Sequence, residues 1–304
     1  MSHSAATASS ALVSQRPEVH LPKLATPRQA SVRAVGVILL AETLAGVAWA
    51  LSSSAWLGFG VLFGAVFAWS FRRRADLQRA LTQNERAREL LDLGQIDEAE
   101  ALLNTLITQH RTPPNIRPFA AYYRGLAAMR RGAYTEARAR LESVIESGWL
   151  GNRRSLQNLA PAIYAAATLA AVLDGELEIA EKWRAEGHRC PANLERHWFV
   201  ADGFTLARTE RWIELLTLLD QRWDAIEGTI SGVGIRQLQL LKALALTRLN
   251  ERGDNYRGLF SGEEIGALIH GLRPGRFDHL STSWPALAEF MRSRHLLITP
   301  TTDS

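Results

Sequence analysis

The stretch RAVGVILLAETLAGVAWALSSSAWLGFGVLFGAVFAWSFRRR, residues 33–74, decides the fold of this chain. Between its flanking arginines, Glu42 is the only charged residue in a long apolar run. One helix over the whole run would be about 57 Å long, nearly twice the hydrocarbon core of a bilayer, which is about 30 Å thick. We therefore expect the run to fold back at the serines Ser52–Ser54 and to form a transmembrane hairpin of two helices, 34–51 and 55–71.

Small residues suit a pair of membrane helices because they let the two backbones approach closely. We expect such contacts between Gly36, Ala41, Ala45 and Ala48 of the first helix and Gly58, Gly60, Gly64 and Ala68 of the second. A charge is costly in lipid, so Glu42 is expected at this interface, bonded to Thr43 or a serine, or protonated. Two alternatives for the whole stretch stay open: a signal peptide cleaved after Ala48-Trp49-Ala50, and a buried hairpin in a soluble core.

The basic residues gather beside the apolar stretch. Residues 1–33, predicted to be a disordered tail rich in Ser, Ala, Thr and Pro, hold four Lys or Arg against one Glu, and residues 72–82 hold four Arg against one Asp. The rest of the chain is close to neutral, which argues against a nucleic-acid partner. By the positive-inside rule both ends of the hairpin face the cytoplasm. There the hairpin and its flanking arginines are expected to contact membrane lipids.

After Arg74 the sequence changes to helical periodicity with a pattern that recurs. A turn glycine ends one helix, an apolar residue follows two positions later, and a small alanine lets the next helix pack closely. The three copies are Gly94, Ile96 and Ala99; Gly132, Tyr134 and Ala137; and Gly175, Leu177 and Ala180. In a weaker fourth copy Glu210 replaces the glycine, followed by Trp212 and Leu215. Seven residues before these turns lie Ala87, Gly125, Thr168 and Gly203.

This pattern resembles the tetratricopeptide-repeat family, in which pairs of antiparallel helices stack into a right-handed superhelix. The resemblance implies a helical solenoid over residues 75–250, whose first helices line a groove for extended peptides or partner helices. The groove positions that it implies are Asn84, Arg88, Phe119, Tyr122, Leu126, Arg130, His197, Val200 and Phe204. Aromatic residues at this spacing are also typical of a core. The Lys and Asn set that clamps a carboxylate in some members is absent apart from Asn84.

The last part of the chain, residues 251–304, is predicted to contain capping helices and a tail. Ser261 and Glu264 form the pattern of a capping box, and Pro285 suits the first turn of a helix. A stacked array needs its last apolar face covered, so these helices are expected to cap it. The fold class predicted for the whole chain is all-α.

Little in the sequence suggests catalysis. The single cysteine, Cys190, lies near His188 and His197, but these residues lack the paired spacing typical of a zinc site. Nucleotide-binding and hydrolase motifs do not occur. We predict no enzymatic activity, cofactor, metal or small-molecule substrate. The alternative is an enzyme or accessory subunit that uses the region of Cys190 and His188, or Glu42.

These patterns together predict a membrane-tethered protein-interaction scaffold with unidentified protein partners. An Ala-rich chain with many arginines and only three lysines is typical of a GC-rich bacterial genome. We therefore expect the protein in a bacterial inner membrane, with the repeat domain in the cytoplasm. The architecture resembles that of HemY-type proteins, which carry two membrane helices before such repeats. The alternatives are an accessory subunit of a membrane enzyme and a membrane-shaping protein whose repeats oligomerise.

Overall fold

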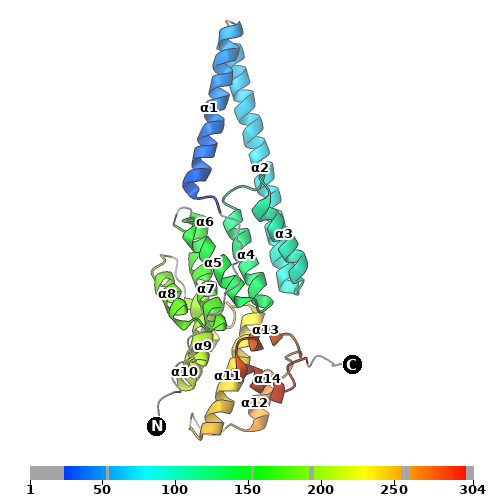
Figure 1. The fold of residues 1–304 in the computed structure, drawn as a ribbon, viewed down its shortest axis with the longest axis vertical. Helices are drawn as coiled ribbons and strands as arrows, with labels where there is room; N and C mark the ends of the chain where they lie inside the picture. The colour runs from blue at the N-terminus through cyan, green and yellow to red at the C-terminus, as the bar shows by residue number, and fades with distance from the viewer. Residues whose placement is uncertain are drawn as a thin grey trace, which may run out of the picture.

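The computed structural model describes residues 24–52, 55–151, 154–191, 195–254, 256 and 260–298, and all regular elements in these ranges are helices. The predicted all-α class is therefore confirmed. Figure 1 shows a long arm rising from a helical body. The helices are α1 (Pro27–Ser52), α2 (Ala55–Leu93), α3 (Ile96–Thr108), α4 (Arg117–Arg130), α5 (Tyr134–Glu146), α6 (Arg154–Gln157), α7 (Ala160–Asp174), α8 (Leu177–Gly187), α9 (Glu195–Arg208), α10 (Trp212–Ile226), α11 (Gly232–Arg252), α12 (Gly262–Ile269), α13 (Asp278–Ser281) and α14 (Pro285–Ser293).

The arm consists of α1 and of residues 55–74 of α2. The two helices contact each other; α1 ends at Ser52 and α2 begins at Ala55, and Ser53 and Ser54 lie outside the described residues. Among the described residues one segment, Pro27–Val47, is long and apolar enough to cross a membrane. The arm exposes Val35, Val37, Ile38, Leu39, Leu40, Leu44, Val47, Val61, Phe63, Val66, Phe67 and Phe71. So large an exposed apolar surface is characteristic of a membrane or a protein contact.

Helix α1 begins earlier than predicted. The disordered tail was expected to reach residue 33, whereas α1 starts at Pro27; the part of the predicted tail before Leu24 lies outside the described residues. Thr26 and Gln29 cap this start reciprocally: the Thr26 Oγ1 accepts from the Gln29 amide at 3.4 Å, and the Gln29 Oε1 accepts from the Thr26 amide at 3.0 Å. Pro27 occupies the first helical position, where its missing N–H costs nothing.

Helix α2 also differs from the prediction, which ended it at residue 71. It continues without interruption through Arg72–Arg74 to Leu93, a length of 39 residues or about 58 Å. Arginine is a good helix former, and no Gly or Pro follows the triplet to stop the helix. The second apolar segment and the first helix of the body are therefore one element.

The expected interface of small residues is largely absent. A Cβ added at Gly36, Gly60 or Gly64 would meet no atom within 4 Å, so none of these glycines marks a close approach of the helices. Ala45 is buried between α1 and α2, whereas Ala48 and Gly58 lie outside the described side chains. Glu42 is exposed on the outer face of α1, and the Thr43 hydroxyl donates to the Leu39 carbonyl rather than to Glu42. The predicted place of Glu42 at the helix interface is thus wrong.

In the body, four turns join helices in contact with each other: α2 to α3, α4 to α5, α7 to α8 and α9 to α10. At the predicted turn positions the backbone is left-handed, with φ of 83° at Gly94, 77° at Gly132, 87° at Gly175 and 56° at Glu210. The helices that follow begin at the predicted apolar residues Ile96, Tyr134, Leu177 and Trp212. The predicted turns are therefore confirmed, including the one that lacks glycine.

The left-handed turns give a first prediction. Gly94→Ala should lower the free energy of unfolding by about 1 kcal/mol, because a Cβ strains this conformation, and no neighbour within 4 Å adds a clash. Glu210→Gly should raise it by about 0.5 kcal/mol, since relief of the same strain outweighs the loss of an exposed ion pair with Arg252. Denaturant unfolding of the detergent-solubilised full chain measures both. Equal stability of wild type and Gly94→Ala would contradict this account of the turns.

The small residues of the pattern let the paired helices pack closely. Ala99, Ala137 and Ala180 are buried. A Cβ at Gly125 of α4 would lie 2.9 Å from the Leu141 side chain of α5. Further contacts run along the chain from α3 to α4, from α5 to α7, from α7 to α9 and from α9 and α10 to α11. The pairs therefore pack one after another, with α9 lying mainly against α7 rather than against α8.

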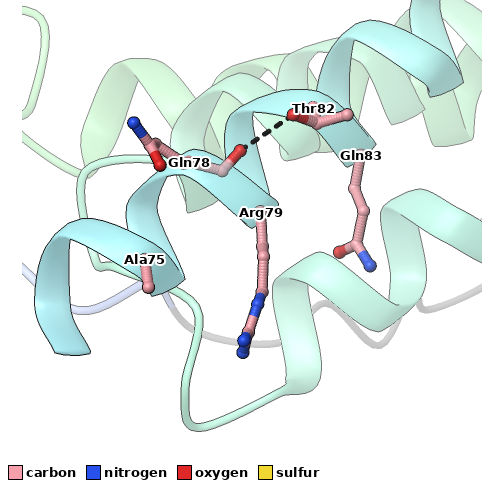
Figure 2. A pocket seen from close by; sticks show the side chains of 5 residues that line it. All are labelled: Ala75, Gln78, Arg79, Thr82 and Gln83. Atoms are coloured by element: carbon pink, nitrogen blue, oxygen red, sulfur yellow. Dashed lines mark hydrogen bonds between the residues drawn. The ribbon is translucent and has the colours of Figure 1, made fainter.

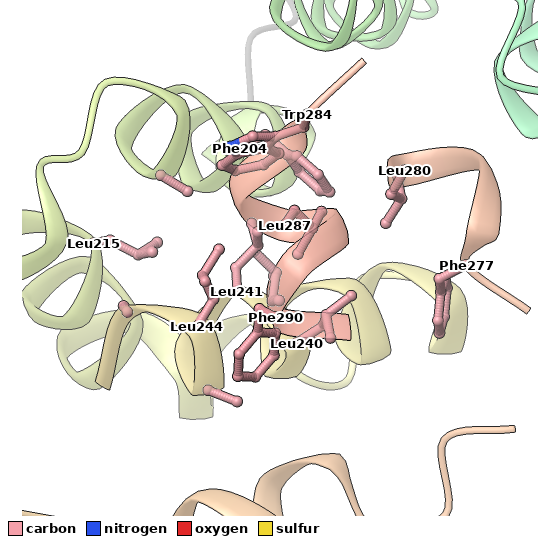
Figure 3. Close-up of a cluster of buried hydrophobic side chains, with 14 of the residues drawn as sticks. Phe204, Leu215, Leu240, Leu241, Leu244, Phe277, Leu280, Trp284, Leu287 and Phe290 are labelled. Atoms are coloured by element: carbon pink, nitrogen blue, oxygen red, sulfur yellow. The ribbon is translucent and has the colours of Figure 1, made fainter. Parts of the chain in front are cut away.

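The C-terminal helices pack on apolar residues of the body. Ser261 and Glu264 form the expected capping box of α12, with hydrogen bonds of 3.1 and 2.7 Å, and Pro285 opens α14. Figure 3 shows Trp284, Leu287 and Phe290 beside the leucines of α11. These apolar residues belong to one buried cluster with Leu240, Leu241 and Leu244.

Candidate interaction surface

The predicted groove residues lie on α2, α4 and α9, and three of them are buried. Asn84 is 5% exposed, Tyr122 9% and Phe204 0%. These three side chains therefore belong to the interior of the body. For Tyr122 and Phe204 this is the core position that aromatic residues at this spacing also indicate. Arg88 is exposed, and Phe119, Leu126, Arg130, His197 and Val200 are half-buried.

The α2 and α4 positions come together on one face. Arg88 lies 3.4 Å from Glu85 on α2, and Arg130 of α4 reaches across to Asp92 of α2 at 3.3 Å. Tyr123 lies between these charges: burial raises the pKa of its hydroxyl, and Arg88 partly offsets that rise. We call Arg88, Asp92, Tyr123 and Arg130 the α2–α4 face. The sequence pattern did not identify Asp92 and Tyr123. It selected Tyr122 instead of Tyr123, because Tyr122 has the spacing of a groove residue.

The α9 positions do not join this face. The Val200 side chain would lie 3.2 Å from a Cβ at Gly234 of α11, so it packs on that helix. The ring of Phe204 lies 6.4 Å from that of Trp284. Burial is the main cause that lowers the pKa of His197, with Arg196 adding to it. The predicted groove is therefore divided, and its α9 part is in contact with α11 and the C-terminal segment.

Residues 278–284 bind across the ends of three helices of the body. The Tyr134 hydroxyl donates to the His279 carbonyl, and the Ser283 hydroxyl donates to the Leu173 carbonyl at the end of α7. Arg208 of α9 donates to the Ser283 carbonyl at 2.8 Å, and its guanidinium lies 5.3 Å above the Trp284 ring. We call residues 278–284 the C-terminal strap. It crosses from the α4–α5 turn to α9.

The buried side chain of His279 is expected to make the folded protein sensitive to acid. Burial, and secondly the charge of Arg130, lower the pKa of His279 to about 4. A histidine in an unfolded chain titrates near pH 6.5, so below that pH the unfolded state binds a proton that the folded state lacks. The free energy of unfolding should therefore be highest above about pH 6.5. It should fall by up to about 3 kcal/mol as the pH drops toward 4.

Unfolding of wild type and His279→Gln between pH 7 and 4 tests this expectation. The variant should lose less stability than wild type over that range, whereas His270→Gln, at an exposed histidine of the C-terminal region, should keep the wild-type loss. Parallel pH profiles for wild type and His279→Gln would contradict it.

The region of Cys190 shows no activated nucleophile. Burial raises the pKa of the Cys190 thiol, whereas a reactive cysteine needs a lowered pKa. His188 stacks on Trp198, with ring centroids 4.4 Å apart. Within the described ranges no group of three His, Cys, Asp or Glu residues is placed to hold a metal ion. The geometry of this region supports packing at the junction of α8 and α9.

Comparison of the chain with protein-family models, curated proteins and solved structures gives no match.

Proposed function

We propose that this protein is a membrane-anchored scaffold that holds partner proteins. In this proposal the arm is a transmembrane helical hairpin, and the paired helices from α2 to α10 form a solenoid similar to that of tetratricopeptide-repeat proteins. The observation that carries the proposal is the continuity of α2, whose first half exposes Phe63 and Phe67 while its second half buries Leu90 and Leu91 in the body. An anchor built this way fixes the orientation of the body at the membrane surface.

The resemblance to tetratricopeptide repeats is supported by the repeated turn. Four turns share a left-handed residue two positions before the next helix, and in the first three the buried alanine recurs at the same place in that helix. The HemY-type architecture, two membrane helices followed by such repeats, remains the parallel that we propose. Repeat folds serve many functions, so this resemblance suggests a binding role without selecting the partner.

The basic residues support a location in a bacterial inner membrane with the body in the cytoplasm. Arg72–Arg74 lie where α2 leaves the apolar part of the arm, and Arg28 lies in the first turn of α1. Both ends of the apolar arm thus carry positive charge, which is retained on the cytoplasmic side. Trp69, close to the arginines, suits the boundary between lipid and water.

The α2–α4 face is the surface that we propose for partner proteins. It combines arginine, tyrosine and a carboxylate, and arginine and tyrosine are enriched at protein interfaces. Its residues come from two helices in contact, so their spacing is fixed by the body. A partner segment carrying both an acidic and an apolar side chain would be complementary to this face.

Crosslinking and affinity purification of the full-length protein from membranes tests this role. Arg88→Ala and Tyr123→Ala should each lower recovery of the crosslinked partner, by about tenfold if these residues are interface hot spots. Arg86→Ala is a matched control, because Arg86 lies on the same helix and forms an ion pair of the same spacing and length, 3.4 Å to Glu89. Equal recovery with Arg88→Ala and Arg86→Ala would exclude this face as the binding surface.

The exposure of Glu42 favours a second candidate, an accessory subunit of a membrane complex. A carboxylate on the outer face of α1 would be costly against lipid, and a partner helix with a polar group would satisfy it. Two variants test whether Glu42 bonds to a partner helix. Glu42→Gln keeps the hydrogen-bonding capacity of the side chain, and Glu42→Leu removes it. Loss of a co-purifying membrane subunit with Glu42→Leu alone would support this role, and retention with both variants would remove it.

A further inference from the structure

A pocket of about 430 Å³ lies at the base of the arm. Its walls come from α1, from the end of the apolar part of α2, from the loop between α3 and α4, and from the first residue of α4. Segments distant in sequence thus meet where the arm joins the body, the level of the proposed membrane surface. The lining residues include Trp69, Arg72, Arg73, Asp76, Arg111 and Arg117.

The charge of this pocket is strongly positive. Four guanidinium groups line it against one carboxylate, that of Asp76. Asp76 lies 3.7 Å from Arg79, which is not among the pocket residues, so part of its charge is already balanced. Within the described part of the chain, Arg72, Arg73 and Arg111 form no salt bridge. An anion in the pocket would therefore meet several arginines without displacing a protein carboxylate from them.

A second hollow on α2 lacks this convergence of arginines. Figure 2 shows this hollow, which follows one face of the helix and is lined by Ala75, Gln78, Arg79, Thr82 and Gln83. Arg79 is the only charged residue among these five. The pocket at the arm base, in contrast, collects arginines from α2, the loop and α4.

Local contacts hold the walls of the pocket in place. Arg117 donates to the Gln109 carbonyl at 2.9 Å, and the Thr112 amide donates to the same carbonyl at 3.2 Å, so both ends of the loop are fixed. The Trp149 indole donates to the Ala25 carbonyl at 2.6 Å, which ties the chain before α1 to the body. Such fixed walls reduce the entropy lost when a ligand binds.

The chemistry of the pocket points to a phosphate group. A guanidinium presents a planar pair of N–H donors that matches the oxygens of phosphate, and several guanidinium groups can share one anion. Trp69, with Arg73 5.0 Å above its ring, and Val37 add an apolar side toward the arm. A phosphate with an attached apolar tail fits both sides, and indole rings prefer the headgroup region of a bilayer.

We propose that this pocket binds the phosphate of an anionic phospholipid headgroup. The proposal rests on the membrane anchor proposed above and adds a defined lipid site to it. A bound headgroup would join the arm, the loop and α4 through one anion, and would thereby hold the body at a set angle to the membrane. Binding should be specific for anionic headgroups over zwitterionic ones.

Native mass spectrometry of the full-length protein in neutral detergent tests the site with phosphatidylglycerol. Arg73→Gln and Arg111→Gln should each weaken binding by about fivefold, the effect of one basic residue near a headgroup. Arg74→Gln is the matched control, because Arg74 adjoins Arg73 with the same charge but does not line the pocket. Its affinity should equal that of wild type. An equal loss with Arg74→Gln and Arg111→Gln would overturn the site in favour of diffuse charge attraction.

Two further binding measurements define the ligand. Phosphatidylcholine should bind the wild type at least fivefold more weakly than phosphatidylglycerol, and equal binding would overturn the proposal. Inorganic phosphate should compete poorly, since it lacks the apolar part; displacement of the lipid by equimolar phosphate would assign the pocket to a soluble anion instead. Carbonate extraction of membranes, run separately, tests the anchor itself. If the protein resists carbonate extraction but binds anionic and zwitterionic lipids equally, the lipid site is excluded. The proposed membrane-anchored scaffold would then still stand.

Discussion

Leu40→Arg combined with Phe63→Arg is expected to release the protein from membranes. Both side chains lie on the arm and are 63% and 67% exposed, so in the proposed anchor they face lipid. An arginine near the centre of a membrane helix costs about 3 kcal/mol, and two such residues cost about 6 kcal/mol. The double variant should move from the carbonate-resistant membrane fraction to the soluble or aggregated fraction, measured by immunoblotting after fractionation.

The body supplies a matched control for this experiment. Leu93 and Ile213 are apolar residues exposed by 71% and 50%, and they lie outside the arm. Leu93→Arg combined with Ile213→Arg introduces the same charge at solvent-facing positions and should leave the protein in the membrane fraction. If both double variants stay membrane-bound, or if both are released, the arm is not the anchor.

Trp284→Ala is expected to detach the C-terminal strap and to lower the free energy of unfolding by about 3–5 kcal/mol, the usual cost of removing a buried aromatic side chain. Trp284 is 5% exposed and contacts Phe204 and Arg208 of α9. Because the strap contributes the Tyr134 and Ser283 hydrogen bonds, its release should also expose residues 278–298 to protease. Denaturant unfolding and limited proteolysis of the full chain measure the two effects.

Two companion variants separate strap docking from general destabilisation. Trp223→Ala removes an indole that is only partly buried, so its effect on unfolding should be smaller and should leave the strap protected. Ser283→Ala removes one hydrogen bond of the strap and should increase cleavage with a loss of only about 1 kcal/mol. Unchanged cleavage of the C-terminal segment in Trp284→Ala would contradict its role in holding the strap.

The turns of the body were predictable from sequence because their cause is local. A residue in a left-handed conformation ends one helix, and an apolar residue two positions later starts the next. These two residues are enough to predict the turn. Glu210 shows that the spacing is a stronger signal than the glycine itself, since a glutamate takes the same conformation at φ 56°. The capping box at Ser261 and Glu264 was predictable for the same reason.

The boundaries of the arm were less accurate because composition was given more weight than helix chemistry. Arg72–Arg74 mark a change in polarity, and a change in polarity does not stop a helix. At the other end, the Thr26 and Gln29 cap lies in a stretch whose Ser, Ala and Pro content suggested disorder. The outward position of Glu42 depends on the rotation of α1 against α2, which the apolar run leaves undetermined.

The candidate surface was predicted only in part because it depends on long-range contacts. Repeat spacing placed Arg88 and Arg130 on two helices that are in contact; Arg88 acts on Tyr123, and Arg130 pairs with Asp92, which also acts on Tyr123. It could not distinguish Tyr122, which is buried, from Tyr123, which is half-buried. The contacts of the C-terminal strap join residues more than a hundred positions apart, such as Leu173 and Ser283. Local patterns do not encode such pairs.

Cysteine accessibility tests most directly the central claim that the arm lies in a membrane with the body on its cytoplasmic side. Leu40→Cys and Leu93→Cys, each in a Cys190→Ser background, carry the same substitution at exposed positions of the arm and the body. A membrane-impermeant maleimide should label neither in intact spheroplasts and should label only the Leu93→Cys protein after permeabilisation. Labelling of the Leu93→Cys protein in intact spheroplasts, or of the Leu40→Cys protein after permeabilisation, would contradict the account.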